Sequence, residues 1–121
     1  GIEPIEVRPG QARLRMRVRA EFVNSVGVCH GGYIFLLADT AFAFACNSHN
    51  QKAVAASANI DFVAPAFGGE LLLAEATEQH LAGRSGVYDV RVTNETGGLV
   101  ALFRGKSATI KGLHLEDAPP A

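Results

Sequence analysis

The stretch that decides the fold runs from Asn24 to Asp39 and reads Asn-Ser-Val-Gly-Val-Cys-His-Gly-Gly-Tyr-Ile-Phe-Leu-Leu-Ala-Asp. The turn His30-Gly31-Gly32 leads into an apolar segment that ends at Cys46 and contains one charged residue, Asp39. The length of this segment, its alanine content and its lack of a polar stripe favour a buried helix. Glycines at a helix start leave backbone N–H groups open, and these donors and the helix dipole favour negative charge. Since an unpaired buried carboxylate is costly, the combination predicts carbonyl chemistry, most simply acyl-group hydrolysis.

The rest of the chain reads as strands separated by turns. Residues 12–20 alternate apolar and basic side chains, which predicts a strand with one buried and one solvated face. Four more strands are expected after the helix, at 54–62, 70–80, around 88–93 and 99–111, divided by turns rich in glycine and asparagine. This order predicts an α+β fold in which an antiparallel β-sheet wraps around one long central helix.

The composition limits the class of protein. The 121 residues fit one domain, which we expect over 1–112, followed by a loose C-terminal tail over 113–121. The first residue is glycine rather than methionine, so an N-terminal piece is expected to be missing. With 48% apolar and only 19% charged residues, the chain is expected to bury apolar surface between subunits.

Charge and cysteine usage exclude several partners. The net charge of −1 does not favour nucleic acid or an anionic membrane, and the four arginines of the first strand are expected to form a solvated face. No apolar run approaches the roughly 20 residues of a membrane span. The two cysteines lack a framework spacing, which favours a reducing, cytoplasmic setting. The four histidines lack ligand spacing, so neither a metal nor a cofactor is expected.

Several motifs carry a family resemblance that extends from Gly1 to about Ile110. They are Cys29-His30-Gly31-Gly32, Leu37 to Ala43, Ala45 to Ser48, Ile60-Asp61-Phe62, Ser85 to Val90 and Ala101 to Ser107. With these motifs the chain resembles the hotdog-fold acyl-CoA thioesterases, and within them the branch of phenylacetate degradation, PaaI. The Ala101 to Ser107 string is the most specific to that branch.

The resemblance implies roles for single residues. The N–H of Gly31 is expected to polarise the thioester carbonyl, and Asp39 to attack that carbonyl or to activate water. Asn24 is expected to orient the substrate or the turn. His30 belongs to the expected site, more as a hydrogen-bonding residue of the turn than as a general base. Cys29 is not expected to act as a nucleophile, because adjacent side chains in a turn diverge.

Substrate contacts are expected from a second group of residues. Gly32 and Thr40 flank the two catalytic groups, and Ser57 lies near a position where some relatives use a hydroxyl, in a register that the sequence leaves open. The phosphates of coenzyme A need a basic partner, for which Arg84, Arg104 and Lys106 are candidates. Ordinary surface charge is the alternative interpretation for each of these three.

The resemblance implies hydrolysis of phenylacetyl-CoA or its ring-hydroxylated derivatives to the free acid and coenzyme A. The alternative is an acyl-CoA-binding regulatory module without turnover, although binding alone does not need Asp39. A dehydratase of the same fold is disfavoured because a His-Phe-Pro-Gly type of motif is absent.

A homo-oligomer is expected, a dimer of dimers with active sites shared across the dimer interface. Eight residues of helix separate Gly31 from Asp39 by about 12 Å. Both groups must lie within about 3 Å of one reacting carbonyl or its water. Two antiparallel helices side by side satisfy this requirement, and one helix does not.

Overall fold

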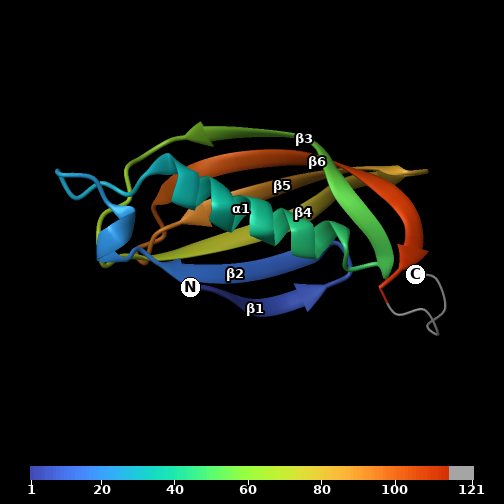
Figure 1. The fold of residues 1–121 in the computed structure, drawn as a ribbon, viewed down its shortest axis with the longest axis horizontal. Coiled ribbons are helices and arrows are strands. Elements are labelled where there is room, and N and C mark those ends of the chain that lie inside the picture. Colours follow the sequence, from blue (N-terminus) through green and yellow to red (C-terminus); the bar gives the residue numbers. More distant parts are fainter. Residues whose placement is uncertain (115–121) are drawn as a thin grey trace.

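A computed structural model describes residues 1–114 of the chain, in which one curved sheet wraps around one helix (Figure 1). The six strands are all antiparallel and lie in the order β1-β2-β4-β5-β6-β3. This confirms the predicted α+β architecture. In chain order the elements are β1 (Ile2–Arg8), β2 (Gln11–Arg17), the short 3-10 helix η1 (Ala20–Phe22), α1 (Gly31–Cys46), β3 (Gln51–Phe62), β4 (Leu71–Ala82), β5 (Ser85–Thr93) and β6 (Leu99–Leu113).

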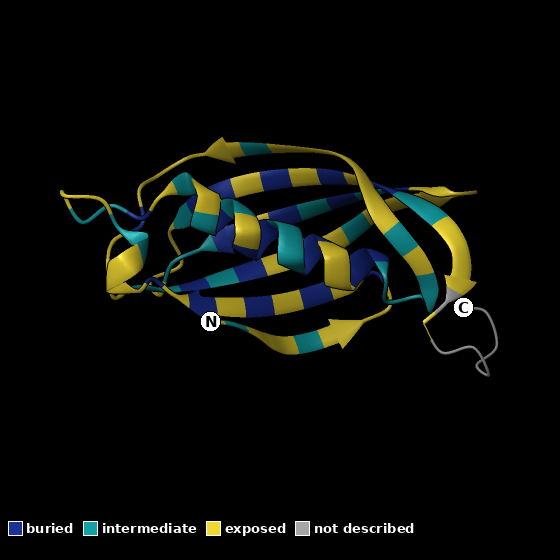
Figure 2. Cartoon of the chain, viewed as in Figure 1, coloured by how far each residue is buried: buried dark blue, intermediate teal, exposed yellow. Residues whose placement is uncertain are grey.

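Helix α1 is buried on one side only. It begins after His30, whose extended backbone (φ −60°, ψ 137°) places it outside the helix, and it ends where Asn47 donates a side-chain hydrogen bond to the Ala43 carbonyl. The sequence predicted a helix buried all round, but Leu36 is 51% and Phe44 39% exposed. The physical reason is that the sheet curves around one side of the helix and leaves the other uncovered in the single chain (Figure 2).

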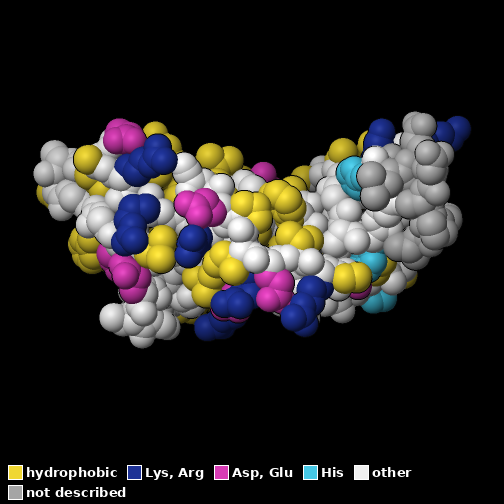
Figure 3. Space-filling view, turned by 90° about the horizontal axis from the view of Figure 1, so that it is seen from below, with side chains coloured by type: hydrophobic (Ala, Val, Ile, Leu, Met, Phe, Trp, Pro, Cys, Tyr) yellow, Lys and Arg dark blue, Asp and Glu magenta, His cyan; other side chains and the backbone are white. Residues whose placement is uncertain are grey.

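Strand β2 has the predicted alternation. Ala12, Leu14 and Met16 are buried, and the arginines between them are exposed. Each exposed arginine pairs with a carboxylate of a neighbouring segment, and basic and acidic side chains lie intermixed on the surface seen from below (Figure 3). The pairs are Arg13 with Glu75, Arg15 with Glu3 and Arg17 with Glu95. This confirms the expected solvated face, on which each of the three arginines is paired with a carboxylate.

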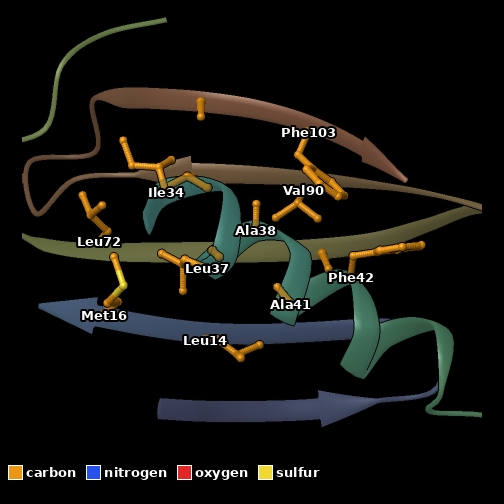
Figure 4. Close-up of a cluster of buried hydrophobic side chains, with 14 of the residues drawn as sticks. Leu14, Met16, Ile34, Leu37, Ala38, Ala41, Phe42, Leu72, Val90 and Phe103 are labelled. Atoms are coloured by element: carbon orange, nitrogen blue, oxygen red, sulfur yellow. The ribbon is translucent and has the colours of Figure 1, made fainter. Parts of the chain in front are cut away.

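The core lies between α1 and the sheet. Side chains from the buried side of the helix and from four strands point toward one another (Figure 4). The ring of Phe42 packs so closely on β6 that a Cβ atom placed on Gly105 would lie 2.8 Å from it. Only a glycine permits this approach, so the helix sits directly on the strand.

Strand β1 was not predicted. Its residues are mostly exposed, Pro4 interrupts the pattern, and the pairing with β2 shifts register between Pro4 and Glu6. An edge strand that buries few side chains has no alternation of apolar and polar residues that the sequence could show. The other predicted strands are confirmed, with β3 beginning at Gln51 and β6 continuing to Leu113, but the first predicted strand ends at Arg17 rather than Ala20, because Ala20 begins the 3-10 helix η1. Beyond His114, the expected tail lies outside the described residues.

A polar cluster closes the C-terminal end of α1. Glu78 on β4 accepts a hydrogen bond from the Tyr88 hydroxyl at 2.7 Å and contacts His49 Nε2 at 2.7 Å. Burial acts to raise the pKa of Glu78, but the hydrogen bonds from Tyr88 and His49 outweigh it and lower that pKa. Burial, together with the bond to Glu78, raises the pKa of Tyr88, so the phenol stays protonated. The cluster joins the loop after α1 to β4 and β5.

We expect Glu78→Gln to remove an acid-sensitive part of the stability. A carboxylate whose folded pKa lies below its ordinary value of 4.5 stabilises the fold above that pH and loses this contribution as the pH falls through the folded pKa. The variant should therefore have a lower Tm than the parent at about pH 7, and the difference should be smaller at about pH 3. Thermal unfolding at both values measures it, and an equal Tm difference at both would contradict the assignment.

Candidate functional site

Hydrogen bonds of the loop before α1 fix the position of the first residues of the helix. Three backbone hydrogen bonds hold this loop. The N–H of Cys29 donates to the Ala66 carbonyl at 2.8 Å, that of His30 to the Phe22 carbonyl at 2.9 Å, and that of Tyr33 to the His30 carbonyl at 3.1 Å. The amides of Gly31 and Gly32 are the first two of the helix, where helix geometry itself supplies no acceptor. They are therefore available to bind an oxygen that carries negative charge.

Asn24 holds this loop in shape. Its side-chain oxygen accepts hydrogen bonds from the N–H of Val26 at 3.0 Å and of Val28 at 3.1 Å. Its backbone N–H donates to the Val28 carbonyl at 2.9 Å, which closes the turn. Of the two roles expected for Asn24, the structure thus shows contacts for orienting the turn. His30 contributes its backbone, since its exposed side chain forms no cap hydrogen bond.

Gly31 lies under an aromatic ring that the sequence analysis did not assign to the site. A Cβ atom placed on Gly31 would come within 2.9 Å of Phe62 Cζ. The two residues line an apolar groove of about 450 Å³, together with Val28, Cys29, Ile34, Val63, Ala64 and Pro65. Phe62 lies at the end of an edge strand without regular alternation, so only the fold brings it to Gly31. Burial raises the pKa of Cys29, which keeps its thiol protonated.

Asp39 lies further along α1, at the border between the covered and the open side of the helix. It is half-buried, and within residues 1–114 no basic side chain forms an ion pair with it. Burial raises the pKa of Cys46 to about 11, and the charge of Asp39, two turns earlier on the same side, adds to this rise. Thr40 is turned back on the helix, where its hydroxyl donates to the Leu36 carbonyl at 2.6 Å.

Gly31 and Asp39 do not meet within one chain. Both belong to α1, and their eight-residue separation corresponds to about 12 Å along the axis. Gly32 lies beside Gly31 and is exposed, with open space where its side chain would be. A single chain therefore has an open amide at the start of α1 and a carboxylate near the middle of the helix, too far apart to meet.

The other expected contacts lie on the outer face of the sheet. Ser57 is paired with Lys106, and Asn59 with Arg104, so these side chains share one face. Lys106 and Arg104 are exposed. The residues that alternate with them along β6 are buried toward the helix, namely Phe103, Gly105 and Ser107. The structure therefore places Ser57 away from Gly31 and Asp39. The reason is a register shift in β3 between Ala55 and Ser57.

The three basic candidates have different surroundings. Arg104 donates to both carboxylate oxygens of Asp89, at 2.6 and 2.9 Å, and these bonds lower the pKa of Asp89. Arg104 thus already has an anionic partner. Arg84 lies exposed in the turn between β4 and β5, and Lys106 is exposed on β6. None of the three lies against the groove over Gly31.

The fold and the site define a class of protein. A curved antiparallel sheet of six strands around one central helix is the hotdog fold of thioesterases. Residues 26–101 match the model of the thioesterase superfamily, so the chain belongs to this superfamily.

Individual relatives narrow the class. The acyl-coenzyme A thioesterase PaaI of Escherichia coli is 47% identical over 93% of this chain and 80% of its own length. The structure of that protein, described as coming from the phenylacetic acid degradation operon, matches with a TM-score of 0.91 over 93% of this chain and 82% of its own. A putative esterase of Archaeoglobus fulgidus is 40% identical over 96% of this chain and 73% of its own length.

A more distant structure was solved with a ligand. The Streptococcus mutans protein smu.793, bound to acetyl-CoA, is 25% identical and matches with a TM-score of 0.89 over 93% of this chain and 91% of its own. In this chain, no helix of the described part is long and apolar enough to cross a membrane.

We expect Asn24→Leu to loosen the loop before α1, and Asn24→Asp to keep it. Leucine removes the oxygen that accepts from Val26 and Val28, whereas a carboxylate still accepts both bonds. One lost hydrogen bond of about 1 kcal/mol corresponds to roughly fivefold faster amide exchange at these two positions. Hydrogen exchange followed by NMR measures this change. Unaltered protection in the leucine variant would show that Asn24 does not hold the turn.

Proposed function

We propose that this protein is an acyl-CoA thioesterase that hydrolyses phenylacetyl-CoA or ring-hydroxylated phenylacetyl-CoA to the free acid and coenzyme A. In this reaction water adds oxygen to the thioester carbonyl, the C–S bond breaks, and the sulfur leaves as the thiol of coenzyme A. The carbonyl oxygen gains negative charge on the way, so catalysis needs donors at that oxygen and a base or nucleophile near the carbonyl carbon.

The observation that carries this proposal is the pairing of two features on α1. The amides of Gly31 and Gly32 open the helix, and Asp39 is the one charged side chain along it. The amide of Gly31 is assigned to the carbonyl oxygen. Asp39 is assigned either to attack on the carbon or to activation of water. Within residues 1–114 Asp39 has no basic partner that would explain it as part of an ion pair.

The relatives support the choice of substrate. The E. coli thioesterase belongs to a phenylacetic acid degradation operon, and its similarity extends over nearly the whole of this chain. The S. mutans structure contains acetyl-CoA on the same fold. Within residues 1–114, Lys106 and Arg84 form no ion pair, so their charge is open to the phosphates of coenzyme A, while Arg104 offers less because Asp89 already neutralises it. A cytoplasmic setting is part of the proposal, and it fits two cysteines that are both free thiols.

A dimer that shares its active sites is the second part of the proposal. The distance along α1 separates Gly31 from Asp39, and Leu36 and Phe44 lie exposed on the same uncovered helix. An antiparallel partner helix covers this apolar face and brings Asp39 of each chain toward Gly31 of the other. Because these side chains are already about half buried, covering each one stabilises the pair by about 1 kcal/mol. Two such dimers are proposed to form a tetramer.

We expect Asp39→Asn to abolish most turnover while the protein stays folded. Asparagine keeps the shape but removes the base or nucleophile, so kcat should fall by about 10²-fold or more. The measurement is thiol release from a panel of aryl-acetyl and straight-chain acyl-CoA thioesters. Asp61→Asn is the matched control, because Asp61 is an exposed aspartate on the outer face of the sheet and should leave kcat unchanged. A parent protein that hydrolyses no thioester would favour the binding module instead.

We expect activity to return when two inactive variants are mixed. Gly31→Pro removes the N–H at the first helical position, where proline is well tolerated, and His30 already has the extended backbone that precedes a proline. Gly31→Ala adds the same Cβ beside Phe62 but keeps the N–H, so it is the matched control. Refolding Gly31→Pro with Asp39→Asn should give mixed dimers with one intact site each. Confirmed subunit exchange without any activity would contradict the shared site.

A further inference from the structure

We propose that Phe62 determines the specificity of this thioesterase, because its ring forms the wall against which the aromatic ring of an aryl-acetyl substrate packs. The inference rests on the proposed function and adds to it the residue that selects the acyl group. It comes from the place of one exposed aromatic side chain directly beside the amide that is assigned to the thioester carbonyl.

The ring of Phe62 points its far edge at Gly31. A Cβ atom on Gly31 would lie 2.9, 3.2 and 3.4 Å from Cζ, Cε1 and Cε2 of Phe62, and these are its nearest neighbours. The ring therefore packs against Gly31, the residue whose amide is assigned to the thioester carbonyl. Phe62 itself is 53% exposed, so one side of the ring is open. A phenylalanine in the core would have no such open side.

Backbone hydrogen bonds hold the segment that carries Phe62. Directly after Phe62, both Val63 and Ala64 donate their N–H to the Val100 carbonyl, at 2.8 and 3.2 Å. The opposite wall is tied to the same segment, because Cys29 donates to the Ala66 carbonyl at 2.8 Å. A groove whose two walls are hydrogen-bonded together keeps its width, which is a requirement for selecting one acyl shape over another.

The groove fits the acyl group and not the phosphates of coenzyme A. No charged side chain lines it among the described residues, and its volume of about 450 Å³ lies in the range of small-ligand pockets. Among the residues that the structure describes, the other lining side chains are small or aliphatic, such as Ile34, Val63 and Pro65, and Phe62 is the one aromatic ring. Contact between two aromatic rings adds about a three- to tenfold preference over an alkyl chain of similar area.

The test compares one aryl and one alkyl substrate. Thiol release is measured with phenylacetyl-CoA and octanoyl-CoA for the parent protein, Phe62→Leu and Phe62→Tyr. In the leucine variant the ratio of kcat/KM for the aryl over the alkyl substrate should fall by about three- to tenfold, with the alkyl value nearly unchanged. Tyrosine keeps the ring and should keep the ratio. Phe67→Leu is the matched control, since Phe67 is an exposed phenylalanine that does not line the groove.

Three outcomes would overturn the inference. An unchanged ratio in Phe62→Leu would show that the ring does not select the substrate. An equal loss for both substrates would indicate general packing. A lower oligomeric state, measured by light scattering, would show that a second subunit covers the ring. If the leucine variant fails to fold, Phe62→Met gives the same comparison with a flexible, unbranched side chain that adapts to its surroundings. A parent protein without any thioesterase activity would instead refute the proposed function.

Discussion

The structure depends on the one-sided burial of helix α1. The sheet supplies a curved inner face of small and aliphatic side chains, and Phe42 reaches β6 only because Gly105 has no side chain. This contact fixes how the helix is rotated about its axis. The same rotation leaves Leu36 and Phe44 uncovered and sets Asp39 at the border of the open face. Core packing therefore determines the position of the Asp39 carboxylate, which is proposed to act in catalysis.

The N-terminal end of the helix depends on a second constraint, the hydrogen bonding of the loop before it. Asn24 satisfies two backbone donors of this loop, and Ala66 accepts the N–H of Cys29. These hydrogen bonds hold the loop in one conformation up to Gly31. The first N–H groups of the helix are left without an intrahelical acceptor. The catalytic assignments of Gly31 and Asp39 thus rest on different forces. Gly31 is placed by polar backbone contacts and Asp39 by apolar packing.

The opposite end of α1 is closed by a different kind of interaction. His49, Glu78 and Tyr88 form a half-buried polar cluster in which one carboxylate oxygen meets both partners. Partial burial acts to raise the pKa of Glu78, but the hydrogen bonds from Tyr88 and His49 to its charged form outweigh this effect, so the carboxylate stays ionised. Nothing in the order of these residues along the chain predicts this contact, because 29 residues separate His49 from Glu78.

The sequence by itself determined the fold class and the helix, and it suggested Gly31 and Asp39 as the residues proposed for the chemistry. Alternation in residues 12–16, the apolar run to Cys46 and the glycine turns are local patterns, and local patterns report which face of an element is buried. Only the tertiary structure decided the remainder. It revealed the exposed edge strand β1, turned Ser57 to the outer face through the register shift in β3, and brought Phe62 over Gly31. Register, edge pairing and the approach of distant segments depend on contacts between residues far apart in sequence, and no local pattern encodes them.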